Sequence, residues 1–202
     1  MRAEGGKSGS LDPQAFRRVM GRFATGVTVV AAEAAQEIHA MTANAVTSVS
    51  LDPLLVLVCV DKRARLNRFI ERAGGFSINV LSEDQEALSR FFAGAWRQPG
   101  TPEFRFVPWV GGPRLIGAVG AIGCHVARAL EADDHWIVLG RVQALHEGDP
   151  SGRPLIFFGG HYRRLSETAG PTAPEEWSAD AVRIYYDEWS SGSPRPSQED
   201  PQ

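Results

Sequence analysis

The spacing of apolar residues near the start of the chain predicts a helix. Four apolar residues recur at intervals of three and four, which places them on one helical face. They are Phe16, Val19, Met20 and Phe23. Asp12 and Pro13 supply an N-cap and a first-turn residue, and Gly26 closes the segment. We therefore expect a helix that ends before Gly26 and packs its apolar face on a sheet.

Most of the chain that follows consists of short apolar, β-branched segments, which are typical of strands. Residues 27–32 and 38–44 flank a polar turn and predict a hairpin, and residues 54–60 form a continuous apolar run, expected of a strand covered on both faces. Further strands are predicted at 76–81, 117–130, 135–145 and 155–158, and helices at 64–72 and 84–92. Many strands and few helices favour a mainly β fold with flanking helices and a closed or sandwiched sheet.

Composition narrows the class of protein. A chain of 202 residues with 43% hydrophobic and 22% charged residues is the size of one domain and can bury a core. The net charge of -3 argues against a nucleic-acid partner. No apolar run is long enough to cross a membrane and the first ten residues hold no apolar signal core, so we expect a cytoplasmic protein with no membrane partner.

The two ends of the chain differ in composition from the middle. Residues 1–11 are mostly small and polar and predict a flexible arm, which leaves 12–168 as the folded domain. Residues 169–202 form an acidic tail rich in Pro and Ser, expected to be partly disordered. Within that tail, the aromatic residues of segment 182–189 could dock on another surface, such as a partner subunit.

Several signatures of known chemistry are missing from the sequence. There is no GxGxxG, phosphate loop, GxSxG or HExxH, and the five histidines show no metal-ligand spacing, so no metal site is expected. Cys59 and Cys124 lie 65 positions apart and form no CxxC, which makes both of them core thiols rather than redox groups.

The segment from Met41 to Leu51 is unusual because hydroxyl and amide side chains alternate with small apolar ones and no charge interrupts them. It precedes Asp52-Pro53, so its later half is expected to leave the strand ladder and expose backbone N–H groups. Such a surface suits a flat neutral ring with donors and acceptors along its edge, such as an isoalloxazine. A polar edge strand followed by a turn is the alternative explanation.

Two other places could bind a charged or polar ligand. Residues 61–65 carry three bases where a helix is expected to begin, which is either an anion site for a flavin phosphate or a solvated basic face. His135 begins a strand after two aspartates, and His161-Tyr162-Arg163 follows a glycine pair that lets a ligand approach the backbone.

The order of the segments resembles the flavin reductase family. It is carried by FRRVMGRFATGVTVV, MTANAVTSVSLDPLLVLVCV, GGFSINVLSEDQ with SRFF, GPRLIGAVGAIGCHV, DDHWIVLGRV and PLIFFGGHYRRL, spread over residues 12–166. The resemblance implies an FMN-binding split β-barrel of Greek-key topology that forms a homodimer. It also implies an NAD(P)H-dependent reductase, which supplies free reduced flavin to a partner monooxygenase.

The same resemblance implies which residues hold the two cofactors. The flavin contacts that it implies are Thr42, Ala43, Asn44, Ala45, Val46, Thr47, Ser48, Val49, Ser50, Cys59, Val60, Asp61, Lys62, Arg63 and Arg65. The nicotinamide contacts that it implies are His135, His161, Tyr162 and Arg163. Asn44, Thr47 and Ser48 would orient the flavin, and no side chain is needed as an acid or base. Two departures from the family pattern are Asp133, which replaces a glycine, and the absence of hydroxyl residues from 62–66.

The choices between FAD and FMN and between NADH and NADPH stay open at this stage. Two other functions are compatible with the residues: an FMN-dependent split-barrel oxidase that holds its flavin tightly, and a non-catalytic flavin-binding module. The first predicts a flavin that survives gel filtration, and the second predicts a flavin complex that nicotinamide does not reduce.

Overall fold

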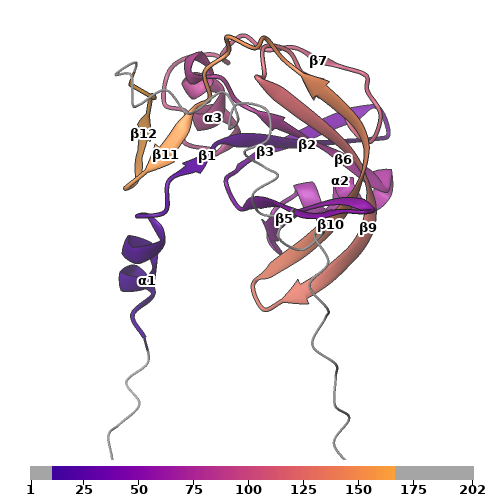
Figure 1. Ribbon diagram of the computed structural model, residues 1–202, viewed down its shortest axis with the longest axis horizontal. Coiled ribbons are helices and arrows are strands. Elements are labelled where there is room, and N and C mark those ends of the chain that lie inside the picture. Colours follow the sequence, from indigo (N-terminus) through magenta and orange to yellow (C-terminus); the bar gives the residue numbers. More distant parts are fainter. Residues whose placement is uncertain (1–10, 167–202) are drawn as a thin grey trace, which may run out of the picture. The chain divides into compact units, whose positions relative to one another are not determined.

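The computed structural model describes residues 11–166, which form a mainly β unit (Figure 1). Its helical segments are α1 (Pro13–Met20), α2 (Leu66–Ala73), the 3-10 turn η1 (Glu83–Gln85) and α3 (Glu86–Phe92). Its strands are β1 (Thr25–Gly26), β2 (Thr28–Ala34), β3 (Glu37–Ala43), β4 (Val46–Leu51), β5 (Leu54–Asp61), β6 (Gly75–Val80), β7 (Phe106–Val107), β8 (Arg114–Leu115), β9 (Gly120–Ala132), β10 (His135–Glu147), β11 (Ile156–Phe158) and β12 (His161–Arg163).

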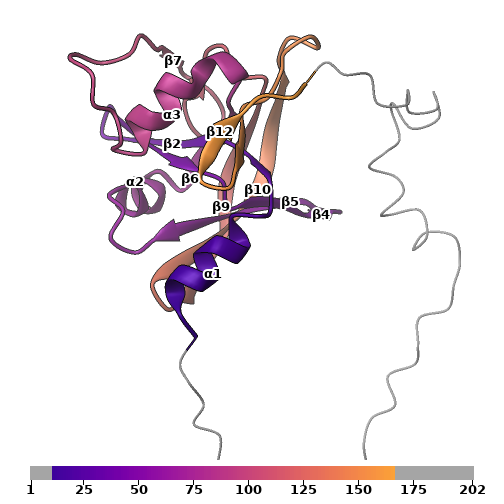
Figure 2. The same ribbon diagram turned by 90° about the vertical axis from the view of Figure 1, so that its left-hand side faces the viewer.

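Seven of these strands form one antiparallel sheet in the order β3-β2-β6-β9-β10-β5-β4. Long connections return strands beside non-consecutive neighbours, as in Greek-key sheets. β3 and β4 stay as the two edges of the sheet, so the barrel is split and the expectation of a closed sheet was wrong. The small β1-β11-β12 sheet lies beside α3 at one end of it (Figures 1 and 2).

The predicted hairpin of residues 27–44 is confirmed, the strands predicted at 117–130 and 135–145 form a second hairpin, and backbone dihedral angles show how each one turns. Ala35 and Gln36 connect β2 to β3 with φ of 52° and 63°, which is the left-handed conformation that a two-residue hairpin loop requires. Asp133 connects β9 to β10 with φ of 46°. A left-handed residue is easiest for glycine, and aspartate tolerates it better than most residues, which explains how Asp133 can stand where the family has glycine.

The main core lies between the concave face of the sheet and α2, which packs against β2, β3 and β6. β5 buries Val56, Val58 and Val60 in this core, whereas Leu57 and Cys59 on its other face are only partly buried. The expectation that both faces of β5 are covered was therefore wrong within a single chain. Cys124 is a core thiol as predicted, but Cys59 is partly exposed.

The buried amide of Asn79 connects strand β8 to the seven-stranded sheet. Asn79 on β6 is fully buried, and its Nδ2 donates to the carbonyl oxygen of Val29 at 3.0 Å and to Ser77 Oγ at 3.0 Å. Its Oδ1 accepts from the backbone N–H of Leu115 at 2.8 Å. Both donors and the oxygen of the side chain are thereby engaged within the protein, which fixes β8 against β6 and β6 against β2.

Helix α1 forms where the apolar spacing predicts it, but it ends at Met20 with Gly21 as its C-cap rather than near Gly26. Asp12 caps its first turn as expected, accepting from the N–H groups of Gln14 and Ala15. None of its residues is buried, and Val19 is 70% exposed. The prediction that this helix packs on the sheet was therefore wrong, because amphipathic spacing does not say which surface covers the apolar face.

The remaining boundaries differ by a few residues from those predicted, and β7, β8 and β12 were not anticipated as separate strands. The predicted arm at 1–11 lies outside the described residues except for Leu11, and so do residues 167–202, including the segment 182–189. Within residues 11–166, no helix has the length and apolar character needed to span a membrane.

Candidate functional site

The polar segment 41–51 runs from one edge of the sheet to the other. Thr42 and Ala43 end β3, Asn44 and Ala45 form the connection, and the rest is β4, which pairs with β5. The expectation that the later half leaves the ladder was wrong. β4 is nevertheless an edge strand with a register shift around Val49, so its outer backbone groups face away from the sheet.

A cavity of about 480 Å³ lies between α1 and the strands β4 and β5; we call it the α1 cavity. Apolar side chains from α1 and from the strands supply most of its walls, among them Phe16, Leu57 and Phe157. The polar groups that line it are mostly neutral, including Asn44 and Thr47, and Arg17 is the charged residue among them. Apolar walls with a few neutral hydrogen-bonding groups suit a flat heteroaromatic ring.

A smaller cavity of about 180 Å³ adjoins the same connection; we call it the Tyr162 cavity. Thr42 Oγ1 donates to the carbonyl oxygen of Ser89 at 2.7 Å, and the hydroxyls of Ser89 and Tyr162 lie 2.8 Å apart. These contacts join β3, α3 and β12 around the cavity. Asn44 lines both cavities, so they meet at the residue between β3 and β4.

Hydrogen bonds hold that junction in place. Asn44 Nδ2 donates to Thr25 Oγ1 at 3.2 Å, and Thr28 Oγ1 donates to the carbonyl oxygen of Ala43 at 2.7 Å. The second of these bonds is buried, which makes it the more costly of the two to break. Thr47 Oγ1 donates to the carbonyl oxygen of Ser48 at 3.2 Å, so its oxygen and the Oδ1 atom of Asn44 are left in the α1 cavity region as acceptors for a ligand.

The basic segment before α2 is engaged with nearby carboxylates. Arg63 forms a two-point contact with Asp61 at 2.7 and 3.1 Å, and these hydrogen bonds hold the pKa of the Asp61 carboxyl well below its usual range. Arg65 pairs with Glu37 at 2.6 Å, and Lys62 pairs with Glu131. All three are surface pairs, which contribute little to stability and can be exchanged for a ligand anion.

His135 lies at the tip of the β9–β10 hairpin, directly opposite Asp61 of β5 in the strand register. Its Nδ1 is 2.7 Å from the carboxylate of Asp134, and this contact lowers the pKa of Asp134. The Tyr162 cavity does not include His135. His161 and Arg163 are exposed on β12, where His161 Nδ1 is 2.8 Å from the carbonyl oxygen of Gly159.

The structure thus brings part of the predicted set together. Of that set, positions 44–47 and 59 line the α1 cavity, and positions 42–44 and 162 line the Tyr162 cavity. The Val60 side chain is fully buried in the core, so only its backbone is available to a ligand. Ser48, Val49 and Ser50 lie farther along β4 and do not line either cavity.

Other lining residues were not anticipated as site residues. They are Phe16 and Met20 from α1, Thr25 from β1, Ser89 from α3 and Phe157 from β11. The aromatic residues Phe91, Phe92, Phe104 and Phe106 line a third cavity, of about 840 Å³, together with Arg65. Phenylalanine and methionine side chains are typical of a core, and only the three-dimensional arrangement shows that these ones surround open space.

Within residues 11–166 no cluster of His, Cys, Asp and Glu is arranged to hold a metal ion.

Comparison with known proteins gives one consistent result. An NADH-dependent flavin reductase of a Rhodococcus species is 44% identical over 165 residues, which is 78% of this chain and 92% of that protein. The reductase component of 4-hydroxyphenylacetate 3-monooxygenase from Thermus thermophilus is 40% identical over 152 residues, covering 75% of this chain and 96% of that protein.

The fold agrees with solved structures as well. The NADH:FAD oxidoreductase SgcE6 of Streptomyces globisporus C-1027, solved in complex with NAD and FAD fragments, superimposes with a TM-score of 0.70 at 36% identity. The match covers 81% of this chain and all of that one. The model of the flavin reductase like domain matches residues 20–166. These residues make up most of the chain, which therefore belongs to the flavin reductase like domain family.

Proposed function

We propose that this protein is an NADH-dependent flavin reductase that supplies free reduced flavin, FAD or FMN, to a partner flavin-dependent monooxygenase. The observation that carries the proposal is the α1 cavity, whose neutral polar groups from the β3–β4 connection face apolar walls. The two relatives described above add support, one as an NADH-dependent flavin reductase and the other as a monooxygenase reductase component.

The side chains of the α1 cavity fit an isoalloxazine ring. Asn44 and Thr47 would bind its polar edge, Phe16 and Leu57 its faces, and Cys59 lies beside it. The ribityl phosphate would reach the segment 61–65, where Lys62, Arg63 and Arg65 can exchange their surface pairs for the anion.

A flavin bound there would supply the chemistry, which is hydride transfer from C4 of a reduced nicotinamide to flavin N5. The task of this chain is to orient the rings and to exclude water, which requires no acid or base. Tyr162, held by Ser89, would position the nicotinamide from the adjoining cavity, and His135, His161 and Arg163 would bind its polar groups. The α1 wall is mostly exposed, so flavin is expected to bind moderately and to leave after reduction.

The test is anaerobic oxidation of NADH, with NADPH in parallel, by the full chain with FAD, with FMN and with no flavin added. Turnover that depends on added flavin supports the proposal, and the rate ratios give both cofactor preferences. A flavin that stays bound through gel filtration would favour a split-barrel oxidase instead. A bound flavin that neither nicotinamide reduces would indicate a non-catalytic flavin-binding module.

We further propose that the protein works as a homodimer in which a second copy packs on α1 and β5 around the α1 cavity, which stays open to flavin and solvent. The support is the apolar face of α1, where Phe16, Val19 and Phe23 are 65%, 70% and 70% exposed. Leu57 and Cys59 on the outer face of β5 are also only partly buried. Burying such a face is the main driving force for association.

We place the folded domain at 12–168 and its activity in the cytoplasm, where a reductase meets its NADH supply.

A further inference from the structure

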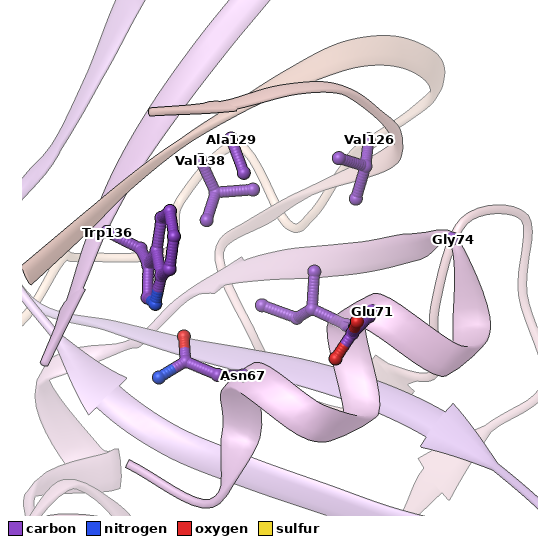
Figure 3. A pocket seen from close by; sticks show the side chains of 8 residues that line it. Asn67, Glu71, Gly74, Val126, Ala129, Trp136 and Val138 are labelled. Carbon is purple, nitrogen blue, oxygen red and sulfur yellow. The ribbon is translucent and has the colours of Figure 1, made fainter. Parts of the chain in front are cut away.

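A separate cavity of about 420 Å³ lies between α2 and the β9–β10 hairpin (Figure 3). We call it the α2 cavity. It shares no lining residue with the α1 cavity or the Tyr162 cavity. Its walls are aliphatic and come from both sides: Ile70 from α2, and Val126, Ala129 and Val138 from the hairpin. The space is therefore a slot with apolar walls where the helix does not completely fill the concave face of the sheet.

The indole of Trp136 forms one side of the slot, and α2 supplies the polar groups at its rim (Figure 3). Asn67 Nδ2 donates to the carbonyl oxygens of Asp61 at 2.8 Å and Ala64 at 3.1 Å. Both donors of that amide are therefore used, which leaves Oδ1 as an acceptor. Figure 3 shows this oxygen directed toward the Trp136 ring.

Glu71 lies one helical turn after Asn67 on the same face of α2 and also lines the cavity. Its side chain is exposed, and no ion pair of Glu71 is found among residues 11–166. The rim of the slot contributed by α2 therefore offers an amide oxygen and a negative charge. Lys62 Nζ lies 5.6 Å from the centroid of the Trp136 ring, and its charge is paired with the carboxylate of Glu131.

This combination selects a ligand by its chemistry. Aliphatic walls and an indole face bind a flat apolar ring. The acceptor Oδ1 and the carboxylate bind a protonated amine. A carboxylate on the same ring would be repelled by Glu71. We propose that the α2 cavity is a binding site for small aromatic amines, distinct from the site of flavin and nicotinamide.

The test compares two ligands that carry the same ring and opposite charge, tryptamine and indole-3-acetate. Each is titrated calorimetrically into the full-length protein, with and without saturating FMN. We expect saturable tryptamine binding that FMN does not displace, and binding of indole-3-acetate at least about tenfold weaker. Because this experiment measures binding alone, its result is independent of whether the protein reduces flavin.

Two variants locate the binding. Ala129 is exposed at the cavity wall, so Ala129→Phe fills the slot without disturbing the core and should abolish the tryptamine signal. Glu71→Gln keeps the shape and removes the charge, and should weaken tryptamine binding about tenfold. Glu147→Gln, at the opposite end of β10, is the charge-matched control and should change nothing.

Several results would overturn the proposal. They are absence of saturable tryptamine binding, equal affinity for the two ligands, displacement of tryptamine by FMN, and undiminished binding by an Ala129→Phe variant that circular dichroism shows to be folded. Displacement by FMN would place the ligand in the flavin site instead.

Discussion

The hydroxyl of Tyr162 on β12 lies 2.8 Å from the hydroxyl of Ser89 on α3, and the Ser89 side chain is completely buried. The Tyr162 ring also packs against Phe157 and lies under the guanidinium of Arg90. Because the chain reaches β12 only after the long β9–β10 hairpin, this contact fixes the β11–β12 hairpin against a helical residue 73 positions earlier.

Tyr162→Phe should lower the free energy of unfolding by about 1–3 kcal/mol, because it leaves the buried Ser89 hydroxyl without this partner. Removing both groups in Ser89→Ala/Tyr162→Phe should cost less than Tyr162→Phe alone. Urea denaturation of Ser89→Ala, Tyr162→Phe, the double variant and the wild type measures these losses. Additive losses would mean that the two hydroxyls do not interact.

The two cysteines should differ in reactivity toward iodoacetamide in the native protein near pH 8. Cys124 is fully buried, and burial raises the pKa of its thiol to about 12, so it should stay unmodified. Cys59 lines the α1 cavity and should be alkylated, and saturating FMN should protect it. Mass spectrometry of digested protein identifies the site. Alkylation of Cys59 at an unchanged rate with flavin bound would contradict its place beside the ring.

Val19→Lys should dissociate the proposed homodimer, since it puts a charge in the middle of the exposed apolar face of α1. Gln14→Lys adds the same charge to an exposed position of the same helix and is the matched control. Light scattering coupled to size exclusion gives the mass of each variant. A wild-type protein that is already a monomer at working concentration would refute the dimer.

The free energy of unfolding should decrease in mildly acidic solution because His39, which stacks on Phe69, becomes protonated. Burial and the nearby Arg65 lower its pKa below 6.5, and Glu37 opposes them. Well above pH 6.5, His39 is neutral in both the folded and the unfolded protein. As the pH falls, the unfolded chain binds the proton first, so the free energy of unfolding declines until the folded pKa has been passed.

The loss should be less than about 1 kcal/mol, because solvent screens this half-exposed side chain. His39→Gln should remove that part of the pH dependence between pH 7 and 5, and His161→Gln, on an exposed strand, should serve as the control. Thermal denaturation at several pH values gives the comparison. An unchanged slope in His39→Gln would exclude this residue as the cause.

His135→Ala should raise the KM for NADH more than it raises the Kd for flavin, if this residue contacts the nicotinamide. The Asp134 contact at 2.7 Å orients the ring, so Asp134→Asn should show a weaker form of the same effect. Steady-state kinetics and flavin titration separate the two constants. Equal losses in both would remove His135 from the nicotinamide site.

The sequence predicts the strands well wherever local patterns determine them. The β-branched apolar runs that flank a polar turn in residues 27–44 and the acidic residues 131–134 specify hairpins, because a hairpin depends on neighbouring residues alone. The polar residues of segment 41–51 likewise stand out in composition. The strand-derived part of the candidate site can therefore be predicted from local sequence.

The rest depends on contacts between distant segments. Ser89 reads as an ordinary helical serine, and only folding places it against Tyr162. Similarly, the apolar spacing of α1 is the same whether the helix packs on its own sheet or on another copy. Asp52-Pro53 forms the turn that its sequence predicts, but β4 keeps its pairing with β5 up to that turn, because a two-residue connection is enough to close the hairpin.

The register shift at Val49 has a consequence for the behaviour of β4 at high concentration. An edge strand with a regular row of free N–H and C=O groups is a template for addition of strands from other molecules. Here Ser48 pairs with Val56 and Ser50 with Leu55, so Val49 is an extra residue that interrupts the row. A foreign strand could match only a few residues before losing register. The bulge thus lets this edge strand remain exposed without starting open-ended fibre growth, and deleting Val49 would turn the same edge into an aggregation seed.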